Sequence, residues 1–169
     1  MFTGCDSRSA SLIVMLTVIL SLATPALAQD CPELVGYMPE SISAVAVAGD
    51  YAYLGGGDEF VVADVSDSAA PRLAGRVALP GSAGDVAVSG GYAYVVGDWP
   101  GLRVFDLSTP SAPVEVGSTD TQGASGVAVS GSYAYVVGQF SFSVIDVSTP
   151  SAPVRVGALR FPEYGPHSD

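Results

Sequence analysis

A unit of about 41 residues, within the size range of known repeat families, occurs three times in this chain. The three copies begin with VAVAGDYAYLGG at Val45, VAVSGGYAYVVG at Val86 and VAVSGSYAYVVG at Val127. Each copy continues with a second apolar run and ends in a short apolar segment that follows a proline. A repeat of this length restricts the fold to architectures that stack one supersecondary unit several times.

Each unit predicts four short β-strands, which in the second copy are 86–89, 92–96, 102–107 and 114–117. Val, Tyr, Phe and Ile dominate these segments, and Gly, Ser and Pro separate them. Four short antiparallel strands in every ~40 residues are typical of a β-propeller blade. The sequence therefore predicts an all-β fold with blades at about 44–76, 85–118 and 126–158. The tyrosines of the second strands, Tyr92 and Tyr94 in one copy and Tyr133 and Tyr135 in the next, should have their rings buried between blades.

The third strands, FVVAD at 60–64, LRVFD at 102–106 and FSVID at 142–146, resemble the LVIVD repeat. That family is found in secreted and surface proteins of bacteria and archaea and is regarded as forming β-propellers. The resemblance covers residues 32 to about 160, from Pro32 through the third blade, and so predicts a repeat domain at 29–160. It implies a propeller, but it brings no established catalytic, cofactor or ligand residues. The WD and kelch signatures are absent.

The number of units predicts an incomplete ring, because closed propellers have about 4–8 blades. An extra outer strand at 32–36 has no partners of its own blade in the sequence, and 161–169 reads as the start of a truncated next-blade loop. We expect an open arrangement that can self-associate through exposed edges. Closure by a dimer is the less favoured alternative, because it would leave the strand at 32–36 surplus.

Residues 1–28 have the pattern of a signal peptide. An apolar run at 10–22 is followed by Ala26-Leu27-Ala28, which is typical of a cleavage site. The mature chain would begin at Gln29 and be extracellular, periplasmic or attached to the cell surface, without membrane insertion. Cys31 would then be its single cysteine, and we expect a disulfide with a partner outside this chain.

The net charge of −11 disfavours nucleic acid and anionic membranes as partners, because both would repel the chain.

Asp64, Asp106 and Asp146 each end a third strand, and Ser-Thr-Pro-Ser-Ala-Pro follows the latter two. A short carboxylate can accept hydrogen bonds from the amides that follow it, which predicts a structural Asx turn. Shared metal binding is the weaker alternative, because equivalent positions on separate blades lie far apart around a ring.

Loops on one face differ between the copies, whereas the turns on the other face are nearly constant. Variable loops on a constant scaffold are typical of a binding surface. The binding candidates in these loops are Asp58, Glu59, Asp98, Trp99 and Phe140. For Trp99 the alternative is a structural role at the rim, over the neighbouring blade.

The sequence contains no recognisable catalytic, metal-ligand or cofactor motif, and its one histidine is His167 near the end. We therefore expect a secreted, non-catalytic module without cofactor, whose partner is a protein or glycan. Two alternatives stay open: a fragment of a propeller hydrolase or lyase whose catalytic residues lie in other blades, and a structural spacer.

Overall fold

The computed structural model describes residues 41–162, except residues 100 and 122. The predicted signal peptide, Cys31, the strand at 32–36 and residues 163–169 lie outside the described part. The described residues belong to one compact unit, which spans Pro32–Asp169. Among them no helix long and apolar enough to cross a membrane was found.

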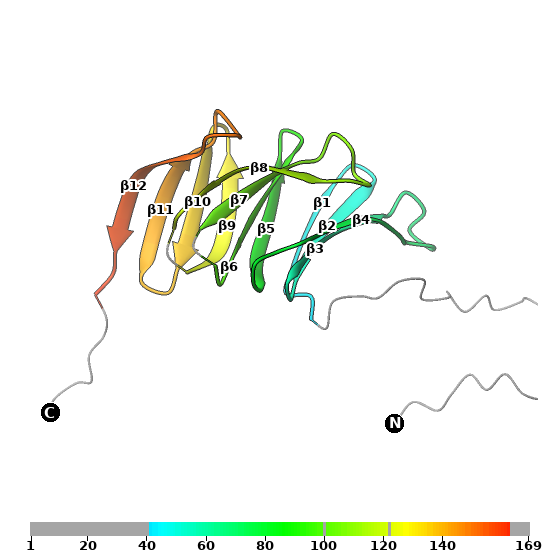
Figure 1. The fold of residues 1–169 in the computed structure, drawn as a ribbon, viewed down its shortest axis with the longest axis horizontal. Helices are drawn as coiled ribbons and strands as arrows, with labels where there is room; N and C mark the ends of the chain where they lie inside the picture. The colour runs from blue at the N-terminus through cyan, green and yellow to red at the C-terminus, as the bar shows by residue number, and fades with distance from the viewer. Residues whose placement is uncertain (1–40, 100, 122, 163–169) are drawn as a thin grey trace, which may run out of the picture. The chain divides into compact units, whose positions relative to one another are not determined.

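The described residues form twelve β-strands in three four-stranded antiparallel sheets, in which neighbouring strands follow one another along the chain (Figure 1). The first sheet consists of β1 (Ala44–Ala48), β2 (Tyr51–Gly56), β3 (Glu59–Asp64) and β4 (Arg72–Ala78). The second consists of β5 (Ala83–Ser89), β6 (Tyr92–Gly97), β7 (Leu102–Asp106) and β8 (Val114–Thr119). The third consists of β9 (Ala124–Ser130), β10 (Tyr133–Gly138), β11 (Ser141–Asp146) and β12 (Val154–Arg160). The predicted all-β fold, with one propeller-like blade per repeat, is confirmed.

Contacts between sheets are made mainly by the inner strands, since β1 lies against β5 and β5 lies against β9. Among the described residues no contact of similar extent joins β9 to β1, so the three sheets do not close into a ring. We call the side of each sheet that faces the preceding sheet its front face, and the side that faces the next sheet its rear face.

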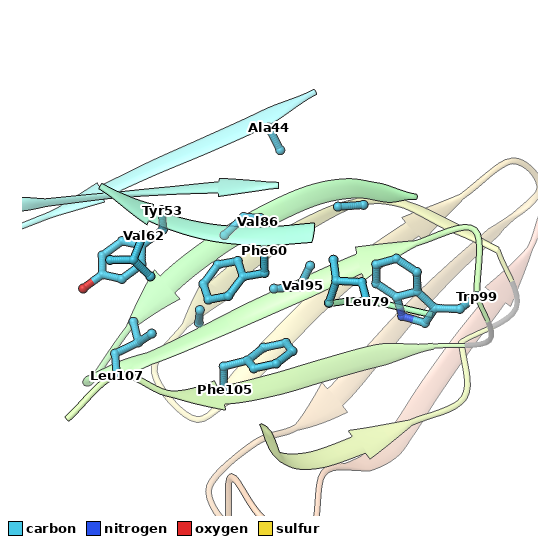
Figure 2. Packing of buried hydrophobic residues seen from close by; sticks show 12 residues of the cluster. Ala44, Tyr53, Phe60, Val62, Leu79, Val86, Val95, Trp99, Phe105 and Leu107 are labelled. Carbon is cyan, nitrogen blue, oxygen red and sulfur yellow. The ribbon is translucent and has the colours of Figure 1, made fainter. Parts of the chain in front are cut away.

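The first core cluster fills the space between the first and second sheets (Figure 2). Because side chains alternate along a strand, Tyr53 and Phe60 point from the rear face of the first sheet, and Val95 and Phe105 point from the front face of the second. The Phe60 and Phe105 rings are stacked with centroids 5.1 Å apart. Both phenylalanines are completely buried.

A second cluster repeats this arrangement between the second and third sheets. Tyr94, Val96 and Val104 come from the rear face of the second sheet, and Val136 and Ile145 come from the front face of the third. Burial of apolar side chains from two facing sheets is the main stabilising term in such a stack.

The proline-rich turns between the third and fourth strands also join neighbouring sheets. A Cβ atom on Gly75 of β4 would lie 2.5 Å from the carbonyl oxygen of Pro110, which belongs to the next sheet's turn. A Cβ atom on Gly117 of β8 would lie even closer to the carbonyl oxygen of Pro150. Only glycine permits this approach, so each turn rests directly on the outer strand of the preceding sheet.

Candidate functional site

The strand connections lie on two opposite edges of the sheets. The turn face consists of the first hairpins of each sheet and the turns at 65–71, 107–113 and 147–153. The loop face consists of the described residues at 57–58, 79–82, 98–101, 120–123 and 139–140. The five binding candidates come from the loop face or from the strand ends that border it.

The three aspartates of the turn face close equivalent turns. Their carboxylate Oδ1 atoms accept hydrogen bonds from the amides of Ser66, Ser108 and Ser148, at 2.9, 2.7 and 2.9 Å. The hydroxyl and amide of Ser66 lower the pKa of Asp64, and those of Ser148 lower the pKa of Asp146. Each carboxylate is thus used within its own Asx turn.

No group of three or more His, Cys, Asp or Glu residues within the described ranges is arranged to hold a metal ion.

Backbone hydrogen bonds join the loops of the first and second sheets. The amide of Leu79 donates to the carbonyl of Asp58 at 2.6 Å, and the amide of Ala83 donates to the carbonyl of Gly57 at 2.9 Å. The amide of Asp98 donates to the carbonyl of Ser82 at 3.0 Å. The connection at 79–82 is therefore bonded to loops of the sheets on both sides, which fixes the backbone of this part of the loop face.

Three of the predicted candidates present side chains to solvent on the loop face. Asp58 and Asp98 are exposed, and the Phe140 ring is 39% exposed. An exposed carboxylate can bind cationic or hydroxyl groups, and an exposed aromatic ring can bind a cation or stack on a sugar face.

Glu59 is less available than its neighbour Asp58. Its side chain is half-buried, and its Oε1 atom lies 3.8 Å from Nη1 of Arg76 in β4. An ion pair of this length at the surface contributes little to stability, but it compensates part of the charge of the carboxylate. Glu59 is therefore a weaker candidate than Asp58.

Trp99 is 5% exposed and belongs to the core between the first two sheets (Figure 2). A Cβ atom on Gly97 would lie 2.6 Å from the indole, and one on Gly81 would lie 3.7 Å from it. The indole fills a space that these glycines leave open, so it cannot stack on a ligand from solvent. We remove Trp99 from the binding candidates, because it packs against the neighbouring blade, which is the structural role given above as the alternative to binding.

Two polar residues that join the sheets were not singled out from the sequence. The Asp85 carboxylate accepts hydrogen bonds from the amides of Val86 and of Val127 in the next sheet, both at 2.8 Å. The Ser43 hydroxyl donates across to the carbonyl of Ala83 at 2.7 Å. Asp85 lies in the inner strand β5 and Ser43 directly precedes the inner strand β1. The available signal for Asp85 was a polar residue directly before the repeated VAV segment.

Comparisons with known proteins agree with this architecture. A family model for the LVIVD repeat matches residues 41–78, 80–121 and 123–159, one match for each sheet. A comparison with curated proteins found no match. The chain is similar in structure to a functionally unknown protein from Desulfotomaculum acetoxidans DSM 771, with a TM-score of 0.61 and 14% sequence identity. The similarity covers 72% of this chain but 43% of that protein, so the chain spans less than half of its length.

Proposed function

The chain belongs to the LVIVD repeat family, and on this premise we propose that it is a secreted, non-catalytic interaction module that binds a protein or glycan through its loop face. The single observation that carries the proposal is the contrast between the two faces of the repeat. The turns DLSTPSAPV and DVSTPSAPV are almost identical, and DVSDSAAPR of the first copy keeps their length, aspartate and second proline, whereas the loops GGGDE, GDWPG and GQFS share only a glycine.

Packing accounts for the constant face. Its turns rest on Gly75 and Gly117 of the preceding sheets, so a changed turn would disturb the stacking of the blades. On the loop face, packing accounts for Trp99 but not for Asp58, Asp98 and Phe140, whose side chains are exposed. Exposed differences between copies of one scaffold are expected where a surface meets a particular partner.

The fixed backbone of the loop face supports the same proposal. The hydrogen bonds that join 57–58, 79–82 and Asp98 hold this surface in one conformation before a ligand arrives. Binding to such a surface loses less conformational entropy than binding to mobile loops.

Export rests on the tripartite pattern of residues 1–28. Expression of the full chain in a bacterial host with a Sec pathway should yield an exported protein whose intact mass corresponds to a chain that begins at Gln29. An uncleaved product retained in the cytoplasm would contradict export without affecting the binding proposal.

The binding proposal is tested with glycan and peptide arrays probed by the full chain. The variants Asp98→Ser and Phe140→Ser remove an exposed acid and an exposed aromatic ring from the loop face. Their matched controls are Asp50→Ser, an exposed acid on the turn face, and Val154→Ser, an apolar residue that is 58% exposed beside the turn at 147–153.

We expect the loop-face variants to weaken binding at least tenfold and the controls to leave it within twofold. The absence of any ligand above background, or equal losses in the variants and their controls, would contradict the proposal.

A further inference from the structure

The rear face of the third sheet is exposed at positions that are buried in the other sheets. Val96 is completely buried, whereas the equivalent Val137 is 45% exposed. Tyr94 is 4% exposed, and the equivalent Tyr135 is half-buried. Leu79 follows β4 and is 7% exposed, whereas Phe161 follows β12 in the same way and is 56% exposed. In each comparison the buried residue is covered by the next sheet.

The front face of the first sheet is exposed along its inner strand. Val45 and Val47 of β1 are 62% and 66% exposed. The residue equivalent to Val45 in the second sheet is Val86, which is 5% exposed because the first sheet covers it. Val61, farther out on the same face, is buried. The open apolar surface therefore lies on the inner strand, which is also where neighbouring sheets make most of their contacts.

The two interfaces within the chain show how a front face meets a rear face. A Cβ atom on Gly55, on the rear of the first sheet, would lie 2.8 Å from a methyl group of Val86 on the front of the second. Gly55 is equivalent to Val137, and Val86 is equivalent to Val45. If the same packing is repeated between two chains, Val137 of one chain meets Val45 of the other chain, whose first sheet covers it.

In two further contacts, a residue of the first or second sheet touches the next sheet, whereas the equivalent residue of the third sheet has its nearest neighbours within its own sheet. Gly75 and Gly117 are covered by the next sheet's turn, whereas the nearest atom to a Cβ on Gly157 would be 3.8 Å away, in Val144 of its own sheet. The Ser43 hydroxyl reaches the next sheet at Ala83. It also donates to the carbonyl of Gly55 in its own sheet, at 3.2 Å. The equivalent Ser125 hydroxyl keeps the second kind of bond, to the carbonyl of Val137 in its own sheet at 3.4 Å.

We propose that the rear face of the third sheet binds the front face of the first sheet in a second copy of this chain. The second copy is the occupant because this chain itself carries both complementary faces and already packs them together twice. The contact is head-to-tail and therefore heterologous, so it closes into a ring or extends into a filament. Two copies would supply six blades, within the ~4–8 blades of closed propellers. Such a ring is the dimeric closure that the sequence ranked second; a filament is the other outcome of the same contact.

Charge substitutions at the two valines that should meet test this pairing. Val137→Asp and Val45→Lys change exposed residues and should each abolish association of the full chain, measured by sedimentation velocity and light scattering. An equimolar mixture of the two variants restores one Asp–Lys contact and one unchanged contact, so it should associate again. Far-UV circular dichroism of each variant checks that the sheets remain folded.

The matched control is Val114→Asp in β8, since Val114 is 58% exposed although the second sheet has neighbours on both sides. This variant should associate like the unchanged chain. All variants contain the same apolar segment at 10–22, so its contribution cancels. As a second, uncharged test, Gly157→Ala adds a Cβ atom that lies 3.8 Å from its nearest neighbour in the isolated sheet but would meet the carbonyl oxygen of the covering turn. It should raise the dissociation constant at least tenfold.

A chain that stays monomeric up to about 100 μM would overturn the proposal, as would association that neither single substitution nor Gly157→Ala weakens relative to the unchanged chain. Failure of the mixture to associate, with each variant folded, would also overturn the pairing of these two faces. None of these outcomes depends on the loop face, so the proposed partner binding is tested separately.

Discussion

Replacement of Tyr94 by alanine should destabilise the chain by about 3–5 kcal/mol, the usual cost of removing a buried aromatic side chain. Tyr94 is 4% exposed and lies in the cluster between the second and third sheets, against side chains of both. The equivalent Tyr135 is half-buried, because no further sheet covers it in the described part of the chain. Tyr135→Ala should therefore cost only about 1–2 kcal/mol, nearer the average for point mutants.

From the sequence alone the two tyrosines are equivalent, since both lie in the segment YAYVVG. Replacement of either by alanine would then be expected to lower the free energy of unfolding by about 3 kcal/mol. The difference between them measures the contribution of the covering sheet. The comparison is made in the Val45→Lys background, because association of two copies would cover Tyr135 and increase its cost.

Urea unfolding followed by two probes provides the free energies. Trp99 is the single tryptophan and is buried between the first two sheets, so its fluorescence reports on that interface. Circular dichroism reports on all three sheets, and agreement of the two probes tests whether the repeats unfold together. A cost below about 1 kcal/mol for Tyr94→Ala, or equal costs for the two tyrosines, would refute the assigned faces of the strands.

Trp99→Ala should lower the free energy of unfolding by about 3–5 kcal/mol through the cavity it leaves, measured by urea unfolding with circular dichroism; a loss of binding without loss of stability would contradict its burial. Desolvation raises the pKa of both Tyr53 and Tyr94, so the folded chain holds these protons more tightly than the unfolded chain. The resulting stability is complete below pH ~10 and is lost as the pH rises further, and Tyr94→Phe should reduce that loss in thermal melts between pH 9 and 11. The hydrogen bonds from Ser148 lower the pKa of Asp146, so their stabilisation is present above the unfolded pKa of ~4 and is lost on acidification below it. Asp146→Ala should therefore weaken the pH dependence of the melting temperature between pH 2 and 5.

The sheets could be predicted from the sequence because a blade depends on local patterns. The alternation of Tyr92 and Tyr94 with small residues marks a strand with two different faces, and Gly90-Gly91 marks a tight hairpin. The same pattern occurs in all three copies, so a wrong assignment in one copy would have conflicted with the others. The observed outer strands β4 and β12 extend two residues beyond the predicted blades, to Ala78 and Arg160.

The surroundings of individual loop residues could not be predicted in this way. Trp99 is buried because Gly97 and Gly81 leave room for it beside Leu79, and these residues come from two segments, the end of β6 and the connection at 79–82. Asp98 and Pro100 beside a single tryptophan indicate a surface loop. The sequence of this loop contains no information on the space that glycines of another segment leave for the indole. The same limit applies to Asp85, whose partner Val127 belongs to the next unit.

The role of the proline-rich segment STPSAP, at 108–113 and 148–153, follows from a comparison of the three turns in the structure. The turn of the first sheet reads VSDSAAP and lacks the first proline of LSTPSAP, yet it forms the same hydrogen bonds. The amide of Ala70 donates to the carbonyl of Asp67 at 3.0 Å, as the amide of Ala112 donates to that of Thr109 at 2.9 Å. The first proline is therefore not needed to form the turn. It is present in the two turns that rest on the glycine of a preceding sheet, where a residue of fixed φ holds the carbonyl oxygen against the facing strand. Within one chain the STPSAP segment thus supports the contact between neighbouring blades, and the aspartate before it specifies the turn. The turn of the first sheet has Ser68 in place of this proline, and its carbonyl oxygen is the one that would approach Gly157 of a second copy.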